Sequence, residues 1–445
     1  MTSEARSVAS LALLYAIRML GLFMVLPVLV IYGGDYRGAT PLLLGAALGV
    51  YGLTQALFQI PLGMLSDIFG RKPIIFLGLM IFACGSLLAA SAESIEGLIL
   101  GRALQGSGAI ASAVMAMLAD LTSEQNRTKA MAAIGASIGL SFSVAMIIGP
   151  MITAVFGLSG VFVLSAILAG VGVGVLYLLV PSPPQSFKRR DTRPIPQLIR
   201  ETAANVELLR LNWGIFSLHA ILMASFVAVP YMLEQDLGIE RAQHWQVYLP
   251  VLLFAFIAML PFMMVAERKQ KIKPVFLLAV FMLAVTLFAL SVFHQNAFAA
   301  FAAIFLFFVA FNLLEATLPS LVSKISPAGS KGTAMGIYST SQFLGAFVGG
   351  LVGGWFMGQF GVSAVFLASA IAAGLWFLVA FGMRKPKHLS SLCVPVVTGF
   401  SSLESVRSLA GIEDAMYAEE ESLLYLKIDK RTLDEGELNA LTGIA

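Results

Sequence analysis

Four ionisable side chains fall inside long apolar stretches of this sequence: Arg18, Arg102, His219 and Glu315. Within a membrane-spanning helix each such residue costs at least about 2.5 kcal/mol on insertion scales, so a functional role is the default expectation. Glu315 and His219 belong to the same half of the chain, and in contact they would titrate as a coupled pair and exchange protons. The alternative for His219 is a ring hydrogen-bonded to a helix backbone. For Arg18 and Arg102 it is structural pairing with backbone carbonyls or a buried acid.

A second group of charges lies in the short polar segment Gly63–Lys72 between two apolar runs. Its glycines let neighbouring helices approach closely, and its acid and bases fall at the adjoining ends of two helices. We expect Arg71 to bridge Asp67 and Asp120, which lies near the end of a later helix on the same side of the membrane. The predicted conformational latch consists of Gly63, Asp67, Gly70, Arg71, Lys72 and Asp120. The alternative is that these charges only enforce topology and anchor helix ends.

The composition is that of a protein with many membrane spans. Hydrophobic residues make up 58% of the 445 residues and charged residues 12%, against about 45–50% and about 25% in ordinary soluble domains. A span needs about 20 mainly apolar residues, and about twelve such runs occur. Because unpaired backbone groups are not tolerated in hydrocarbon, the runs must be helices. The predicted spans are 8–32, 41–64, 73–92, 96–119, 130–156, 160–180, 210–233, 245–266, 274–293, 297–323, 332–357 and 361–383.

The placement of Lys and Arg predicts the orientation in the membrane. If the N-terminus is cytoplasmic, the outer loops carry only Arg37 and Arg241, while the inner loops carry a large excess of positive charge. Cytoplasmic loops are enriched in Lys and Arg, so both termini are predicted to be cytoplasmic. The segment before the first apolar run does not resemble a cleavable signal, and we expect that run to remain as a span.

A polar linker divides the membrane-embedded part into two bundles. Residues 181–209 begin with many Pro, Lys and Arg residues, and Ile195–Leu209 has apolar residues at near-helical spacing. This pattern predicts a cytoplasmic linker with an amphipathic helix on the inner leaflet, the alternative being a disordered tether. The predicted bundles cover residues 1–180 and 210–386.

An internal repeat relates the two bundles. The segment Arg127–Met131 has a counterpart in Lys331–Met335, and the same offset places Gly149 onto Gly353. Two halves of six helices related as parallel repeats are typical of many secondary transporters, which bind substrate near the midplane between them.

Residues 387–445 are polar and predict a small soluble cytoplasmic domain. The expected strands are Val394–Val397, Gly411–Tyr417 and Leu423–Ile428, and the expected helices are Ser401–Ala410 and Leu433–Leu441. This β-α-β-β-α order is compatible with a ferredoxin-like α+β module. Because a Cys-x-x-Cys loop is absent from the sequence, we expect regulatory or self-association contacts instead of metal binding.

Several motifs resemble those of the major facilitator superfamily. The pattern Gly63-x-Leu65-x-Asp67-x-x-Gly70-Arg71-Lys72 is similar to the family signature between the second and third helices. Three further segments resemble a bacterial subgroup of the family that has a soluble C-terminal domain. They are Arg18-Met-Leu-Gly21, Leu100-Gly-Arg102-Ala-Leu-Gln105-Gly106 and Asp120-Leu-Thr122. Where the typical signature has Arg after the Asp, this chain has Ile68, so a latch must rely on Arg71.

The resemblance implies an all-α polytopic membrane protein with the major facilitator fold, in a bacterial inner membrane. It implies that the first, fourth, seventh and tenth helices line a central cavity, so Arg18, Arg102, His219 and Glu315 would face the transport path. It also implies that the latch holds the two halves together on the cytoplasmic side when the transporter faces outward.

The remaining cavity wall is expected to be apolar and aromatic, with a few neutral polar contacts. The candidate lining residues are Asn312, Gln55, Gln59, Gln105, Phe23, Tyr51, Phe226, Phe311 and Tyr338. Aromatic residues are equally typical of plain packing, and glutamines also form hydrogen bonds between helices.

Gly149 and Pro150 look like the tail of the antiporter signature of drug-efflux members of the family. The match is partial, because Ala145 stands where that signature has Gly and Met151–Ala154 lacks its following glycines. A small-residue packing face explains the same residues. The pair therefore favours proton-driven export without deciding it.

These features predict a proton-coupled secondary transporter that exports a small organic or amphipathic compound by alternating access. The sequence has no Gly-x-x-x-x-Gly-Lys-Ser/Thr loop, so direct use of ATP is disfavoured. We expect no cofactor, metal or nucleic-acid partner. The competing hypothesis is a membrane sensor or regulated importer whose C-terminal domain signals or gates. An enzyme is disfavoured, because the spans show no His/Asp metal cluster and no Ser-His arrangement.

Overall fold

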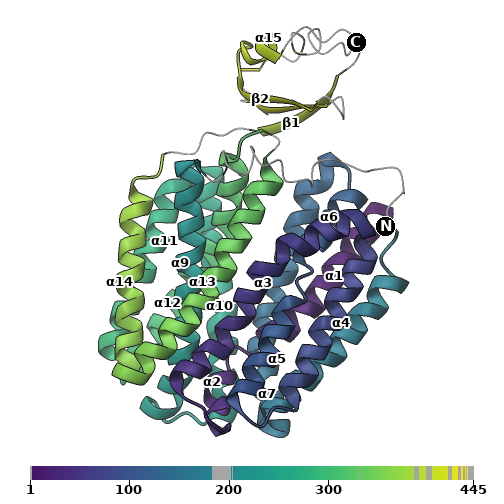
Figure 1. Cartoon of the computed structure of the whole chain (residues 1–445). Helices are drawn as coiled ribbons and strands as arrows, with labels where there is room; N and C mark the ends of the chain where they lie inside the picture. The colour runs from purple at the N-terminus through teal and green to yellow at the C-terminus, as the bar shows by residue number, and fades with distance from the viewer. Residues whose placement is uncertain are drawn as a thin grey trace.

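The computed structural model describes residues 3–182, 202, 204–328, 330–384, 390–396, 403–418 and 423–428, together with 432, 433, 436 and 438. Most of the predicted linker helix therefore lies outside the described residues. The structure is a bundle of long helices with a small β-sheet domain beyond one end (Figure 1). That end, which also carries Gly63–Lys72, is called the inner face here, and the opposite end the outer face.

Two helices of the N-terminal half begin at strong capping residues. The elements of this half are α1 (Ser3–Phe23), α2 (Leu29–Tyr32), the 3-10 helix η1 (Gly33–Asp35), α3 (Pro41–Phe69), α4 (Arg71–Ala90), α5 (Ile95–Ser107), α6 (Ala111–Leu121) and α7 (Glu124–Leu178). Thr40 accepts a hydrogen bond from the Leu43 N–H, and Pro41 occupies the first turn of α3. Ser94 caps α5 in the same way.

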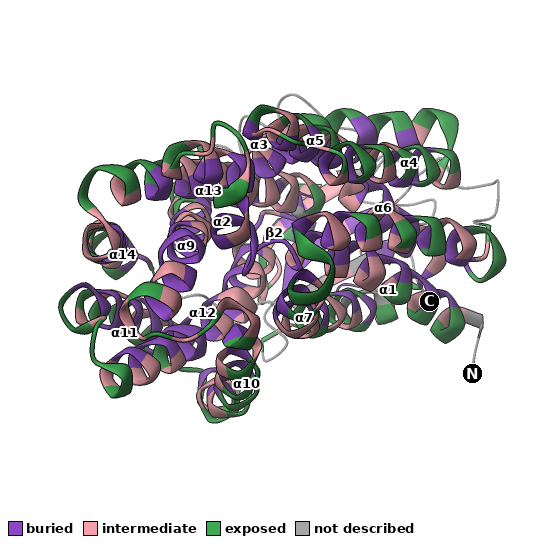
Figure 2. Cartoon of the chain, turned by 90° about the horizontal axis from the view of Figure 1, so that it is seen from below, coloured by how far each residue is buried: buried purple, intermediate pink, exposed green. Residues whose placement is uncertain are grey.

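The C-terminal half starts at Val206, earlier than the predicted 210, because Asn205 caps its first helix. Its elements are α9 (Val206–Tyr231), the π-helix η3 (Met232–Asp236), the 3-10 helix η4 (Arg241–Gln243), α10 (His244–Arg268), α11 (Ile272–Phe293), α12 (Ala297–Ile325), α13 (Lys331–Phe360) and α14 (Val362–Phe381). Exposed positions gather on the rim of the bundle (Figure 2), where apolar side chains such as Phe288 and Leu378 would contact lipid.

Two predicted spans are interrupted. The run predicted as 8–32 divides into α1 and α2, because Pro27 has no N–H and disfavours helical backbone at the residue before it. The run predicted as 96–119 divides into α5 and α6 at Gly108. A methyl group at Gly108 would lie 2.3 Å from the carbonyl oxygen of Gly78 on α4, so the close approach of α4 requires glycine at this position.

The fifth and sixth predicted spans both lie within α7 and meet at Gly157, whose φ is 66°. Gly361, which separates α13 from α14, has a φ of 79°. The offset that relates Gly149 to Gly353 also relates these two glycines, so the repeat extends to a shared left-handed turn. Among the described residues eleven helices are long and apolar enough to cross a membrane, and the division of α7 brings the spans to twelve, in agreement with the sequence.

The two halves meet at the outer face and separate toward the inner face. α3 packs against α13, and a methyl group on Gly49 would lie 2.6 Å from the carbonyl oxygen of Phe347. The apolar core of the C-terminal half continues into the outer part of the N-terminal half, including Met24. The inner part of the N-terminal half, including Leu118, forms a separate apolar cluster. The described residues therefore adopt a conformation that is open toward the inner face.

The C-terminal domain contains a three-stranded sheet. Its described elements are β1 (Ser390–Pro395), α15 (Leu403–Arg407), β2 (Ile412–Ala418) and β3 (Leu423–Ile428). β3 lies between β1 and β2 and is antiparallel to both, which is a split β-α-β arrangement. β3 has the predicted bounds, β1 starts earlier than predicted, α15 is shorter than predicted, and most of Leu433–Leu441 lies outside the described residues.

Candidate functional site

A polar cluster lies inside the C-terminal half, where α9, α12 and α13 supply one residue each. The amide nitrogen Nε2 of Gln342 donates to Oε1 of Glu315 at 3.3 Å and lies 2.8 Å from Nε2 of His219. His219 Nε2 lies 3.9 Å from Glu315 Oε2. The Glu315 side chain is 38% exposed and that of His219 12%. The structure therefore brings the two predicted titratable groups together. The Glu315 side chain is the more exposed of the two, although its Oε2 atom is buried and has no hydrogen-bond partner in the described part of the chain.

The geometry of Gln342 constrains the protonation of its neighbours. When its NH₂ group donates to both residues, His219 Nε2 must be the acceptor and the imidazole must be neutral. If His219 Nε2 binds a proton, its N–H and the NH₂ group of Gln342 would be two donors facing each other. The Gln342 amide would then have to turn. This arrangement links proton occupancy to the orientation of one side chain.

The predicted latch residues meet at the inner face between α3, α4 and α6. Arg71 donates from Nε to Oδ2 of Asp120 at 3.0 Å, and it also pairs with Asp67. Ser66 Oγ accepts from Arg71 at 2.7 Å. In this conformation the charged cluster joins three helices of the N-terminal half.

The glycines of the same segment allow this geometry. Gly70 separates α3 from α4 with a φ of 96°, a backbone conformation that favours glycine. A Cβ on Gly63 would lie 3.0 Å from Cβ of Ser112 on α6. Lys72 does not join the two acids, because its Nζ donates to the carbonyl oxygen of Val180 at 2.7 Å. It therefore anchors the start of α4 to the end of α7.

Arg18 and Arg102 are packed inside the N-terminal half, at 2% and 0% exposure. Arg18 donates to Tyr51 Oη at 2.8 Å and to the Gly108 carbonyl at 3.3 Å, and its guanidinium lies 3.8 Å from the Phe82 ring centre. Arg102 donates to the Ala47 carbonyl. Aromatic faces and backbone carbonyls stabilise both cations. Both side chains are buried in this conformation, and their place on the transport path stays a prediction.

Three candidate cavity residues belong to the same buried network. Gln105 accepts from Arg102 at 2.8 Å and donates to Ser86 at 2.7 Å. Tyr51 donates to Gln55 at 3.1 Å. Gln59 is also buried, at 3% exposure. Hydrogen bonds between helices, the alternative interpretation, hold Tyr51 and Gln105, whereas Gln55 is bound within α3. All four residues are buried, so none of them lines an open cavity here.

The aromatic candidates do converge, around a residue that the sequence did not single out. Phe142 on α7 lies 5.2 Å from Phe23, 6.3 Å from Phe226 and 6.3 Å from Phe311, measured between ring centres. Because Phe142 belongs to the N-terminal half and Phe226 and Phe311 to the C-terminal half, this cluster joins the halves deep within the bundle. Tyr338 is buried on α13.

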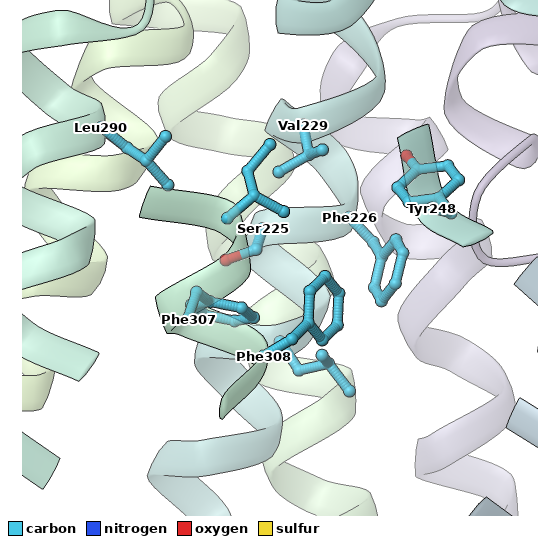
Figure 3. Close-up of a pocket in the computed structure, with 9 residues that line it drawn as sticks. Ser225, Phe226, Val229, Tyr248, Leu290, Phe307 and Phe308 are labelled. Atoms are coloured by element: carbon cyan, nitrogen blue, oxygen red, sulfur yellow. The ribbon is translucent and has the colours of Figure 1, made fainter. Parts of the chain in front are cut away.

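A small pocket adjoins this aromatic cluster within the C-terminal half (Figure 3). Its lining residues are Leu222, Ser225, Phe226, Val229, Tyr248, Leu290, Ile304, Phe307 and Phe308. The hydroxyl groups of Ser225 and Tyr248 are buried and have no hydrogen-bond partner in the described part of the chain. The pocket is thus small and apolar, and neither hydroxyl reaches its open surface.

Gly149 allows close packing of α7 on the end of α1. A methyl group there would lie 2.4 Å from the carbonyl oxygen of Met24. Its counterpart Gly353 packs against Ala224 of α9 in the same manner, at 2.7 Å. Pro150 follows within α7. The geometry accounts for Gly149 as a packing residue.

Asn312, another candidate cavity residue, lies one turn before Glu315 on α12.

Sequence reasoning missed Gln342, Phe142 and Ser66. Gln342 had a usable signal, because an amide within a glycine-rich span is a polar group that needs a partner in the membrane. Phe142 is one of 32 phenylalanines, and only the packing of the two halves distinguishes it from the others.

The arrangement of twelve spans in two repeated halves, with a buried acid and an inner-face charge cluster, is that of a secondary transporter. The chain matches the family model of the Major Facilitator Superfamily over residues 11–350 and 211–408. The protein belongs to this family and is a transporter, not an enzyme. It is a multi-pass protein of the inner membrane.

Among its relatives is the inner membrane transport protein YajR of Escherichia coli, 48% identical over 98% of this chain and 96% of that protein. Multidrug resistance protein 3 of Bacillus subtilis is 26% identical over 72% of this chain and 56% of that protein. A solved bacterial homologue of the human lysosomal transporter Spinster has the same fold, with a TM-score of 0.71 at 15% identity, covering 87% of this chain and 98% of that one.

Proposed function

We propose that this protein is a proton-coupled exporter of small organic or amphipathic compounds that works by alternating access. Twelve spans in two repeated halves suit rocking of one half against the other around a central site. The similarity to a multidrug resistance protein supports export. Protons are the proposed counter-ion, and the substrate moves in exchange for them.

The observation that carries the proposal is the partly exposed Glu315 side chain beside His219 and Gln342. Acids within membrane spans mark proton relays, and such a group can bind a proton from one side and release it when the opposite face opens. Gln342 supplies a neutral contact that holds the two titratable groups within reach. Glu315 is the proposed proton carrier, and His219 its coupled partner.

The aromatic cluster around Phe142 and the neighbouring pocket support an apolar, partly aromatic substrate. Offset and edge-to-face contacts favour aromatic ligands. Phe226 belongs to both the cluster and the pocket. Arg18 and Arg102 have a structural role in this proposal and stabilise the N-terminal half.

The latch is proposed to control the inner face. The Arg71 cluster with Asp67 and Asp120 fixes the relative positions of α3, α4 and α6. When the inner face closes, this rigid corner is the surface that the N-terminal half presents to the C-terminal half. Loss of the cluster would therefore slow the return to the outward-facing state.

Proteoliposomes with an imposed pH gradient test the proposal. Wild-type protein should move substrate against its concentration gradient and dissipate the pH gradient. Glu315→Gln should abolish both while still exchanging substrate for substrate, because a neutral residue cannot carry the proton. If Glu315→Gln still couples substrate movement to proton flux, the proposed role of Glu315 is wrong.

The competing function is a membrane sensor or regulated importer. The contact between the C-terminal domain and the helix bundle favours this alternative. The strand order of that domain supports a ferredoxin-like module with a regulatory role. Removal of the residues after Lys387 separates the hypotheses, because an exporter should retain substrate flux and a sensor should lose its output.

A further inference from the structure

The C-terminal domain binds the end of the helix that carries Glu315. Lys427 on β3 donates from Nζ to the carbonyl oxygens of Ser323 at 2.9 Å and Lys324 at 3.2 Å. These residues form the last turn of α12, whose carbonyls have no partners within the helix and attract a cation. Lys427 is only 4% exposed, so this is a buried, charge-assisted contact.

A second contact holds the adjoining loop. Asp414 on β2 accepts a hydrogen bond at 2.8 Å from the backbone N–H of Ala328, between α12 and α13. Asp414 and Lys427 are paired positions in the antiparallel ladder of β2 and β3. Asp414 and Lys427, on neighbouring strands, therefore both bind the segment where α12 ends and the α12–α13 loop begins.

The domain lies over the opening between the two halves. In side view the sheet is beyond the inner ends of the helices (Figure 1), and in the view along the bundle β2 appears at the centre of the molecule (Figure 2). Both contacts described above are with the C-terminal half. The sheet thus lies beyond the inner ends of α12 and α13, over the place where the two halves would meet on closing.

We infer that the C-terminal domain, docked on the α12–α13 loop through Lys427 and Asp414, acts as a wedge that holds the transporter in its inward-open conformation. Its release is then a requirement for closure of the inner face. The inference rests on the proposed alternating-access function. It also gives the domain an inhibitory role that an effector binding to the sheet would relieve.

A reversible cross-link tests the wedge. In a C84S/C393S background, Ala328→Cys and Asp414→Cys are joined by a short bis-methanethiosulfonate reagent and later released with dithiothreitol. Substrate transport in proteoliposomes should fall close to the protein-free background when the residues are joined and recover on reduction. The two single-cysteine variants, treated identically, control for the reagent. Equal transport in the joined and reduced states would overturn the inference.

A distance measurement tests the wedge without any transport assay, so its failure is distinguishable from failure of the proposed function. Spin labels on Lys129 and Lys269, exposed at the inner ends of α7 and α10, report the separation of the halves by double electron–electron resonance. Lys427→Met should increase the inner-closed fraction by about tenfold, the population change expected when a charge-assisted hydrogen bond is lost.

Glu404→Gln is the matched control, because Glu404 is an exposed charge on α15 of the same domain. It should leave the distance distribution unchanged. If Lys427→Met gives the same distribution as Glu404→Gln, the domain does not restrain the halves. The cross-linking experiment leaves Lys427 intact and therefore remains decisive if Lys427→Met unfolds the domain.

Discussion

Gly45 on α3 and Gly350 on α13 pack backbone against backbone across the two halves, so that a methyl group on Gly45 would lie 2.1 Å from the Gly350 carbonyl oxygen. Gly354 lies on the same side of α13, and its Cβ position is 2.4 Å from the Pro41 carbonyl. The outer face is therefore closed by glycine contacts that tolerate no side chain. Such contacts seal tightly, and Arg241 of the C-terminal half adds an ion pair with Asp35 of the N-terminal half at 3.8 Å.

Gly45→Ala should open the outer face. The methyl group meets backbone, which cannot turn away, and overpacking of this kind costs about 1–3 kcal/mol. Spin labels on Gly34 and Glu240, exposed in the outer loops, should show a larger outer-open fraction. Gly336→Ala is the control, because nothing lies within 4 Å of that position on α13. A distribution identical to that of the control would contradict the proposed seal.

Gln342→Leu should uncouple proton movement from substrate movement. The substitution removes the amide that lies between His219 and Glu315, while the leucine fills a similar volume. Downhill efflux should persist, and accumulation driven by a pH gradient should be lost. Ser341→Ala is the neighbouring control, since its hydroxyl bonds to the Ile337 carbonyl of its own helix. Normal gradient-driven accumulation by Gln342→Leu would exclude Gln342 from coupling.

Asp120→Asn should slow turnover by weakening the latch. The change removes the negative charge that pairs with Arg71, where a hydrogen bond to a charged group is worth about 1.5–3 kcal/mol, and transport should fall roughly tenfold. Arg71→Lys should act similarly, because an ammonium lacks the fork that contacts Asp67 and Asp120 at once. Lys72→Gln serves as the control, as Lys72 binds the Val180 carbonyl. Wild-type turnover in Asp120→Asn would support a purely topological role for these charges.

Gln105→Ala should lower the stability of the N-terminal half. It removes the acceptor of an Arg102 N–H and the amide that donates to Ser86 Oγ in a buried network, at a cost of about 1–3 kcal/mol. Thermal unfolding in detergent measures the effect. Gln59→Ala should unfold closer to wild type, because its buried Oε1 has no partner to lose. If Gln59→Ala is the more destabilising of the two, the network does not stabilise this half.

Much of the fold follows from local sequence properties. Long apolar runs can only be helices in a membrane, the Lys and Arg distribution predicts their orientation, and the repeated segments reveal two halves. The grouping of Asp67, Arg71 and Asp120 was also predictable, because each residue stands at a helix end on the same side of the membrane. These properties depend on sequence distance or on membrane depth, both of which can be read from one chain.

Tertiary structure alone decided which side chains meet across helices. The sequence predicted Arg18 and Arg102 as cavity residues, yet both are buried against Tyr51 in the structure. The rotation of a helix about its axis determines what each side chain contacts, and a uniformly apolar helix gives no signal of that rotation. The same uncertainty hid Phe142 among many phenylalanines and Gln342 beside Glu315. The sequence by itself thus determined the spans, their orientation and the charged segment at the inner face. The contacts between halves, and the docking of Lys427 on α12, arise from packing between segments far apart in the chain.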